Sequence, residues 1–132
     1  MNQKLGMKVY LDTDYETALE QVAEALKVEG FGVLTEIDVK ATFKKKLDVD
    51  FRNYKILGAC NPTFAHKALL AAPEVGLLLP CNVTVSEEDD GKILVHIINP
   101  AMMMSVIENS ALTDVAADVK ERLNRVAEAL AK

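Results

Sequence analysis

The fold is decided by the stretch VGLLLPCNVTVSEEDDGKILVHII, residues 75–98, because two apolar segments in it are separated by a short polar one. Apolar residues alternate with polar ones toward the end of residues 75–86 and again in residues 92–98, which is typical of strands with one buried face. Residues 87–91, Glu-Glu-Asp-Asp-Gly, are turn formers. We therefore predict a β-hairpin whose strands span residues 75–86 and 92–98.

Outward from the hairpin, the same patterns predict the rest of the chain. Alternation predicts further strands, and apolar residues at three- and four-residue steps predict helices. The strands are expected at residues 7–11, 31–37 and 54–59, and the helices at 14–29, 39–47, 62–71 and from 110 to the end, with a short Met-rich helix after residue 100. This order predicts one α+β domain over residues 1–132. We expect a mainly antiparallel sheet with helices packed on one face and a long C-terminal helix.

Helix start signals support these boundaries. Asn61-Pro62 and Asn99-Pro100 each place a capping asparagine before a proline at the first helical position. Thr13 with Glu16 three residues later is typical of a capping box. On the 39–47 helix we expect Phe43 and Leu47 to be buried.

Composition limits the class of protein. The 132 residues carry a net charge of −5, which argues against a nucleic-acid-binding protein. The two cysteines form no disulfide framework, and no apolar segment is long enough for a signal peptide or a membrane span. We therefore expect a cytoplasmic protein with free thiols and no membrane partner.

Cys60 is the first candidate site residue, because it lies where a predicted strand ends and a predicted helix begins at Asn61-Pro62. Backbone N–H groups and the helix dipole at such a position stabilise anions and thiolates. His66, four residues after Pro62, is a candidate acid or base on the same helix face. The alternatives are that Cys60 only packs beneath the helix start and that His66 lies at the surface.

The predicted hairpin supplies three more candidates. Cys81 shares the alternation of Leu77 and Val83, which predicts that it is a core residue. With the turn centred near residue 89, Asn82 faces His96 on the other side of the sheet. These polar side chains either line a pocket or face water. A parallel crossover between the strands at residues 54–59 and 75–86 would bring Cys60 near Cys81, and the alternative is that the two cysteines lie on opposite faces.

The chain also resembles a known family, the domain-of-unknown-function family 302. The resemblance rests on residues 29–42, 54–62, 65–69 and 76–83, together with Asn99-Pro100 and the methionines that follow. It extends almost from end to end. What it implies is an α+β fold, often dimeric, without an established biochemical role.

From these features we hypothesise a small-molecule binding module. Its anionic ligand would bind at the helix N-terminus, in a pocket formed by residues Cys60, Asn61, Pro62, Cys81, Asn82 and His96. The alternatives are a thiol-dependent enzyme or redox protein that uses Cys60 with His66, and a soft-metal site formed by the cysteines and Met102-Met103-Met104. No cofactor is predicted, since the chain has no Gly-rich phosphate loop. We also expect a homodimer through an exposed strand edge or the Met102–Met104 helix.

Overall fold

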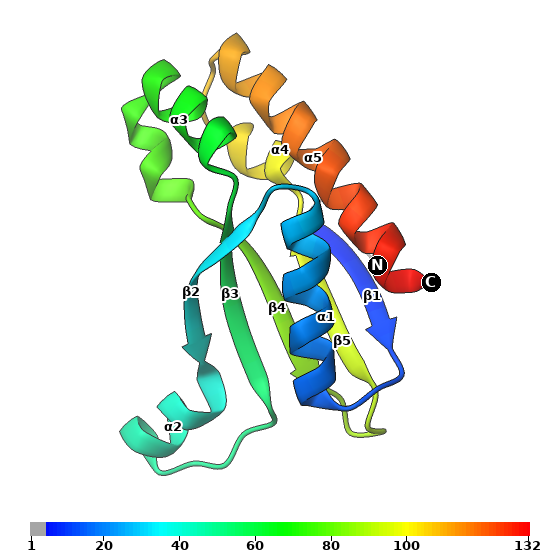
Figure 1. Ribbon diagram of the computed structural model, residues 1–132. Helices are drawn as coiled ribbons and strands as arrows, with labels where there is room; N and C mark the ends of the chain where they lie inside the picture. The colour runs from blue at the N-terminus through cyan, green and yellow to red at the C-terminus, as the bar shows by residue number, and fades with distance from the viewer. Residues whose placement is uncertain (1–4) are drawn as a thin grey trace.

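The computed structural model describes residues 5–132, apart from the side chains of residues 103 and 104. Figure 1 shows a five-stranded sheet with helices along one side and at both ends. The elements are, in chain order, β1 (Gly6–Leu11), α1 (Tyr15–Val28), β2 (Gly32–Asp38), α2 (Val39–Leu47), β3 (Tyr54–Cys60), α3 (Pro62–Ala71), η1 (Pro73–Leu78), β4 (Cys81–Glu87), β5 (Ile93–Ile98), α4 (Pro100–Met104) and α5 (Ser110–Ala131). This is the expected α+β fold.

All neighbouring strands in the sheet are antiparallel. The strand order is β1-β5-β4-β3-β2, so β1 and β2 form the two edges. The predicted hairpin lies at the centre as β4 and β5, with Thr84 opposite His96. The register is two residues away from the predicted one, which had set Asn82 opposite His96. A parallel arrangement of β3 and β4 is also wrong, because α3 and η1 return the chain antiparallel beside β3.

The first half of the predicted strand at residues 75–86 is not a strand. Pro73–Leu78 form the 3₁₀-helix η1, and β4 begins only at Cys81. Proline has no N–H to donate to a sheet, so the pairing of β4 starts after Pro80. Val75 is buried, whereas Leu77 is 88% exposed, contrary to its predicted place on the buried face.

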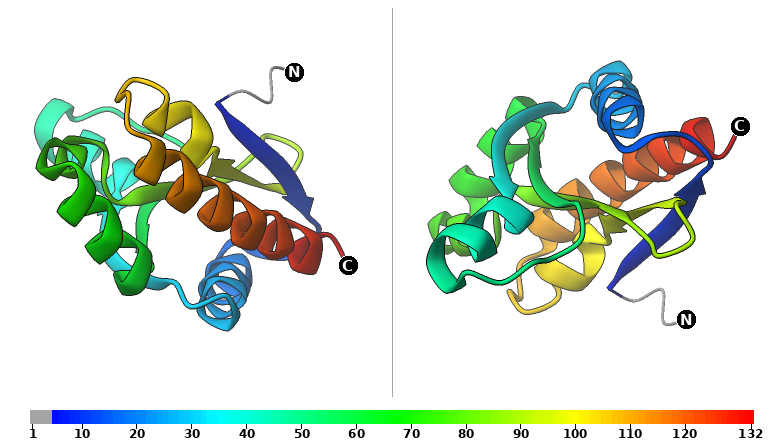
Figure 2. Two further views of the ribbon diagram at one scale, coloured as in Figure 1. Left: turned by 90° about the horizontal axis from the view of Figure 1, so that it is seen from above. Right: turned by 90° about the horizontal axis from the view of Figure 1, so that it is seen from below.

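Two long amphipathic helices bury one face of the sheet. The stripe of α1 (Ala18, Val22 and Leu26) and the stripe of α5 (Leu123 and its neighbours) form one core with the inward side chains of the strands. The views in Figures 1 and 2 show α1 and α5 on the same side of the sheet. The opposite face is not covered by either helix, which leaves its central part open.

Helix termini follow the predicted chemistry with one correction. Asp14, not Thr13, caps α1, and its carboxylate accepts a hydrogen bond from the Thr17 backbone N–H at 3.1 Å. The chain leaves α1 through Gly30, whose φ of +86° favours glycine. In α2 no residue is buried, and Leu47 is 65% exposed, so its predicted burial is wrong. The reason is that α2 lies at the lower end of β2 and β3, away from the core (Figure 1).

The edge strand β2 carries an irregularity. Its register to β3 shifts between Val33 and Thr35, so that Leu34 has no partner and is 67% exposed. Such a β-bulge bends the edge and interrupts regular pairing.

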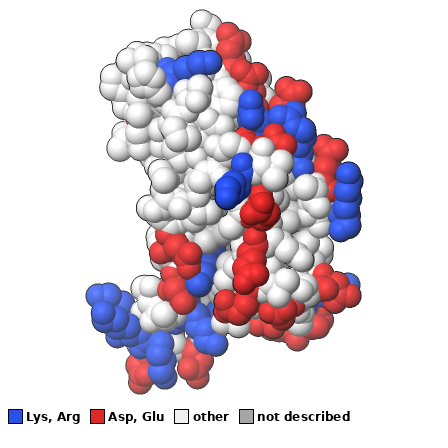
Figure 3. All heavy atoms as spheres, in the orientation of Figure 1, with Lys and Arg blue, Asp and Glu red and all other residues white. Residues whose placement is uncertain are grey.

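Charges are distributed unevenly over the surface. Figure 3 shows basic side chains gathered over α2, where Lys44, Lys45 and Lys46 are exposed, and few charges over α3. Within the described residues, no helix has the length and apolar character needed to cross a membrane.

Candidate functional site

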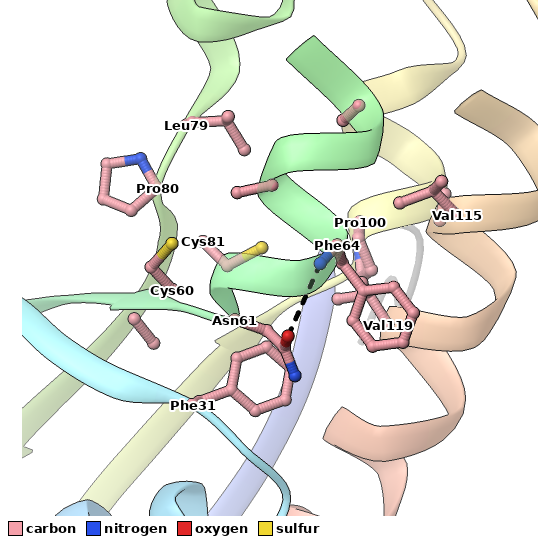
Figure 4. A pocket seen from close by; sticks show the side chains of 14 residues that line it. Phe31, Cys60, Asn61, Phe64, Leu79, Pro80, Cys81, Pro100, Val115 and Val119 are labelled. Carbon is pink, nitrogen blue, oxygen red and sulfur yellow. Dashed lines mark hydrogen bonds between the residues drawn. The ribbon is translucent and has the colours of Figure 1, made fainter. Parts of the chain in front are cut away.

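The predicted site residues divide between two places. Cys60, Asn61 and Cys81 line a pocket between the upper ends of β3 and β4, α3 and α5 (Figure 4). Asn82 and His96 line a separate concavity on the open face of the sheet. Alternation explains the division, because Cys81 points toward the core and Asn82, the next residue, points to the other face.

The pocket at Cys60 is small and apolar. Its volume is about 30 Å³, which is room for one or two water molecules. The lining is formed by Phe31, Ala59, Cys60, Asn61, Phe64, Ala65, Ala68, Leu79, Pro80, Cys81, Pro100, Val115, Ala116 and Val119. Charged side chains are missing from this described lining. The pocket therefore offers neither the volume nor the charge that an organic anion needs.

Cys60 and Cys81 are neighbours, since Ala59 and Cys81 are partners in the sheet and both cysteines line the pocket. Both thiols are free. Burial raises the pKa of Cys60 above its usual value. Burial, with a smaller contribution from Cys60, raises the pKa of Cys81 to about 11. Both groups are therefore protonated at neutral pH, the opposite of what an activated nucleophile needs.

The N-terminus of α3 is closed by its own cap. The Asn61 side-chain oxygen accepts a hydrogen bond from the Phe64 backbone N–H at 3.5 Å, marked by the dashed line in Figure 4. Pro62 follows as the first helical residue and is exposed. His66 is also exposed and is not among the pocket-lining residues. Cys60 and His66 therefore do not share a pocket.

The concavity on the open face is much larger, with a volume of about 630 Å³. It extends over β1, β5, β4 and the start of β3. Its lining combines polar and apolar residues, namely Leu5, Gly6, Lys8, Tyr54, Asn82, Thr84, His96, Ile97 and Ile98. Ligand pockets in proteins have volumes of about 300–1,000 Å³ and a similar mixture of many apolar groups with a few polar ones.

Three polar residues form a row across the floor of this concavity. Lys8 on β1 is paired with His96 on β5, and His96 is paired with Thr84 on β4. Residues in register on neighbouring strands project from the same face about 5 Å apart. The row therefore brings an ammonium group, an imidazole and a hydroxyl together from residues far apart in the sequence.

The Thr84 hydroxyl differs from the other buried polar side-chain groups of the described residues. Its oxygen is buried and has no hydrogen-bond partner, and no other buried side-chain polar atom in residues 5–102 and 105–132 shares this property. Leaving a buried polar group unpaired costs about 1–3 kcal/mol. Because most buried polar groups in native folds are hydrogen-bonded, this unpaired hydroxyl is an exception that asks for an explanation.

His96 is half-buried beside this hydroxyl. Burial is the largest cause that lowers its pKa, and the positive charge of Lys8 lowers it further, while Glu88 raises it. The imidazole is therefore mainly neutral at pH 7, with one nitrogen that donates a hydrogen bond and one that accepts.

Comparisons with known proteins place the chain in a family. Residues 7–130 match the model of the domain of unknown function DUF302. The chain belongs to this family. The crystal structure of an uncharacterized conserved DUF302 protein from Bacillus stearothermophilus is similar, with a TM-score of 0.87 and 31% sequence identity. The match covers 96% of this chain and 98% of the other one. No curated protein matches.

Three polar side chains in the concavity of this DUF302 chain, Lys8, Tyr54 and Thr84, were not among the predicted site residues. Lys8 is the polar residue between Met7 and Val9 on β1, and Tyr54 begins β3. The alternation on β1 indicated that Lys8 lies on the open face. The pairing of β1 with β5, which brings Lys8 to His96, had no signal in the sequence.

The soft-metal hypothesis gains no support from the DUF302 chain. Within the described residues, no three histidine, cysteine or acidic side chains are grouped as a metal site. Met102 is 44% exposed on α4 and does not line the pocket with the two cysteines. The side chains of Met103 and Met104 lie outside the described residues.

Proposed function

We propose that this DUF302 chain is a small-molecule binding module whose ligand, a small organic anion, binds in the concavity on the open sheet face. The single observation that carries the proposal is the buried, unpartnered hydroxyl of Thr84 on the floor of that concavity. Rotation about the Thr84 Cα–Cβ bond would turn this buried hydroxyl toward a ligand in the concavity, and a hydrogen bond to the ligand would then remove the cost of the unpaired group. Ligand-free protein keeps that cost.

The neighbours of Thr84 support a ligand that is anionic. Lys8 supplies a positive charge, and no acidic side chain is among the described residues that line the concavity. Asn82, exposed two residues before Thr84 on the same strand face, adds a side-chain amide donor. Three kinds of donor around one space suit an anion, because hydrogen bonds to a charged acceptor are stronger than those to a neutral one.

The concavity supports this function better than the pocket at Cys60. The pocket has about 30 Å³ for a ligand, against about 630 Å³ on the open face. Asn61 already occupies the end of α3 with its own side chain. The proposed function is therefore the binding module that the sequence predicted, with its site on the open face of the sheet instead of at the N-terminus of α3.

The same observations give less support to a thiol-dependent enzyme. The raised pKa of Cys60 keeps its sulfur protonated. His66 is exposed and outside the pocket that Cys60 lines. A base that would activate the thiol is thus missing from the described part of its surroundings.

The test uses Thr84→Val, which keeps the shape of the side chain and removes the hydroxyl. We expect the free variant to be as stable as the wild type or more stable by up to about 1–3 kcal/mol, since an unpaired polar group is gone. In a thermal-shift screen of small organic anions, we expect the ligands that stabilise the wild type to stabilise Thr84→Val less. Native mass spectrometry of freshly purified protein would look for a co-purifying ligand.

Thr35→Val is the matched control. Thr35 lies on the edge strand β2, is exposed and does not line the concavity. It should leave ligand responses unchanged. If no anion stabilises the wild type at millimolar concentration, or if Thr84→Val responds as the wild type does, the proposed function is wrong.

A further inference from the structure

The lining of the concavity also bears on the chemical class of the anion, an inference that rests on the proposed function. Two observations bear on it, namely the charge of the lining and the placement of polar and aliphatic side chains along the strands.

The charge around the concavity matches a single negative charge. Lys8 is the one permanently charged side chain among the described lining residues. His96 is neutral at pH 7 because its burial and Lys8 lower its pKa. Sites for phosphate dianions normally combine arginine or several cations with the N-terminus of a helix. Neither an arginine nor a helix terminus is among the described lining residues, so one carboxylate fits the charge and a dianion does not.

Aliphatic side chains lie beside one end of the polar row. The row formed by Lys8, His96 and Thr84 supplies the polar groups. Two residues beyond His96 on β5 lies Ile98, paired with Gly6 on β1, and Leu5, which is 65% exposed, comes just before β1. Positions two apart on a strand are separated by about 7 Å. A ligand that lies along the strands therefore meets the polar row at one end, and Ile98, Leu5 and the Asn82 amide at the other.

We propose that the ligand is a monocarboxylate with an apolar body, bound with its carboxylate at the row of Lys8, His96 and Thr84 and its body over Leu5 and Ile98. The carboxylate accepts from the Lys8 ammonium group and, once rotation about the Thr84 Cα–Cβ bond turns the buried hydroxyl outward, from Thr84. His96 donates through one ring nitrogen. The exposed Leu5 and the half-buried Ile98 cover the body of the ligand and remove part of its apolar surface from water.

The test compares four probes that differ in one property each. Octanoate has the carboxylate and the apolar body, octanamide lacks the charge, acetate lacks the body, and octyl phosphate carries a second charge. Binding is followed on the full chain by NMR, through the ring resonances of His96 during titration. We expect octanoate to bind about tenfold or more tightly than each other probe.

Two lysine variants separate a specific contact from general attraction. Lys8→Met removes the charge in the concavity and keeps the aliphatic stem, and it should abolish the preference for octanoate over octanamide. Lys92→Met removes an exposed charge beside the β4–β5 turn, outside the concavity, and should leave the preference intact. Circular dichroism checks that both variants fold.

The outcomes distinguish this inference from the proposed function. Equal binding of octanoate and octanamide, or tighter binding of octyl phosphate, overturns the monocarboxylate and leaves a binding site on the open face. If no probe and no member of a wider anion library shifts the His96 resonances, both ideas fail. Shifts that depend on protein concentration alone would show a second copy on this face and also overturn the inference.

Discussion

Thr84 and His96 are directly opposite each other on β4 and β5, yet the Thr84 hydroxyl has no hydrogen-bond partner. Two side chains that could satisfy each other project from the same face and do not do so. The open face therefore carries a hydroxyl and an imidazole side by side that do not bond to each other. This relationship distinguishes the open face from a polar sheet surface that merely contacts water.

The titration of His96 gives the first prediction. Because burial lowers its folded-state pKa below the ordinary 6.5, the neutral form is favoured by folding. The associated stability is fully present above about pH 6.5 and is lost as the pH falls through the folded-state pKa. We expect His96→Gln to weaken the dependence of unfolding free energy on pH between about pH 7 and 5. Urea unfolding at a series of pH values measures this.

The matched control for that experiment is His66→Gln, since His66 is exposed on α3. It should keep the loss of stability that the wild type shows. Parallel pH profiles for the wild type and His96→Gln would contradict the prediction.

The thiols give the second prediction. At pH 7 we expect iodoacetamide to modify Cys60 in the folded protein more slowly than it modifies free glutathione, because burial raises the pKa of Cys60. Cys81, with an exposed fraction of 7% and a pKa of about 11, should react later still. Mass spectrometry over time measures both rates, with urea-unfolded protein as the control. Rapid labelling of Cys60 would restore the thiol-dependent enzyme as a candidate.

Packing gives the third prediction. Leu123→Ala on α5 should cost about 2–5 kcal/mol of unfolding free energy, since Leu123 is fully buried in the main core. Leu77→Ala on η1 should change it by no more than about 0.5 kcal/mol, because that side chain is 88% exposed. Urea unfolding compares the two leucines. A large loss for Leu77→Ala would mean that a partner covers η1.

The homodimer remains a prediction as well. We expect sedimentation equilibrium at micromolar concentration to give twice the 14.5 kDa of one chain. Leu34→Lys on the β2 edge and Met102→Lys on α4 test the two expected interfaces, since both side chains are exposed. The variant at the true interface should dissociate the dimer and the other should not. A single wild-type species with the mass of one chain would refute the predicted homodimer.

Local chemistry made most of the fold predictable. The alternation in β4 and β5, the polar turn between them and the asparagine caps of α3, α4 and α5 each depend on residues close in sequence. Where an apolar run lacked a period, as in residues 75–79, sequence could not separate a strand from a 3₁₀-helix. Pro80, which has no N–H to donate to a sheet, was the residue that argued against a continuous strand there.

The site was predictable only in part, for a different physical reason. Sequence parity correctly assigned Cys81 to the core and Asn82 and His96 to the other face. The volume of each pocket and the order of the strands in the sheet could not be predicted from the sequence. Whether the α3 terminus leaves space depends on how Phe31 and Phe64 fill it, and whether Lys8 reaches His96 depends on which strand pairs with β1.

The position of β1 at the sheet edge has a consequence for dynamics. This strand is hydrogen-bonded to β5 alone, whereas β5 and β4 each have two neighbours. Edge strands open by local unfolding more readily than interior ones, and their amide protons exchange with solvent faster. A ligand that contacts Lys8 on β1, His96 on β5 and Thr84 on β4 would link the edge strand to two interior strands without a covalent bond. Its binding should therefore slow amide exchange in β1 more than in β3, which gives a kinetic signature of occupancy even for a weak ligand.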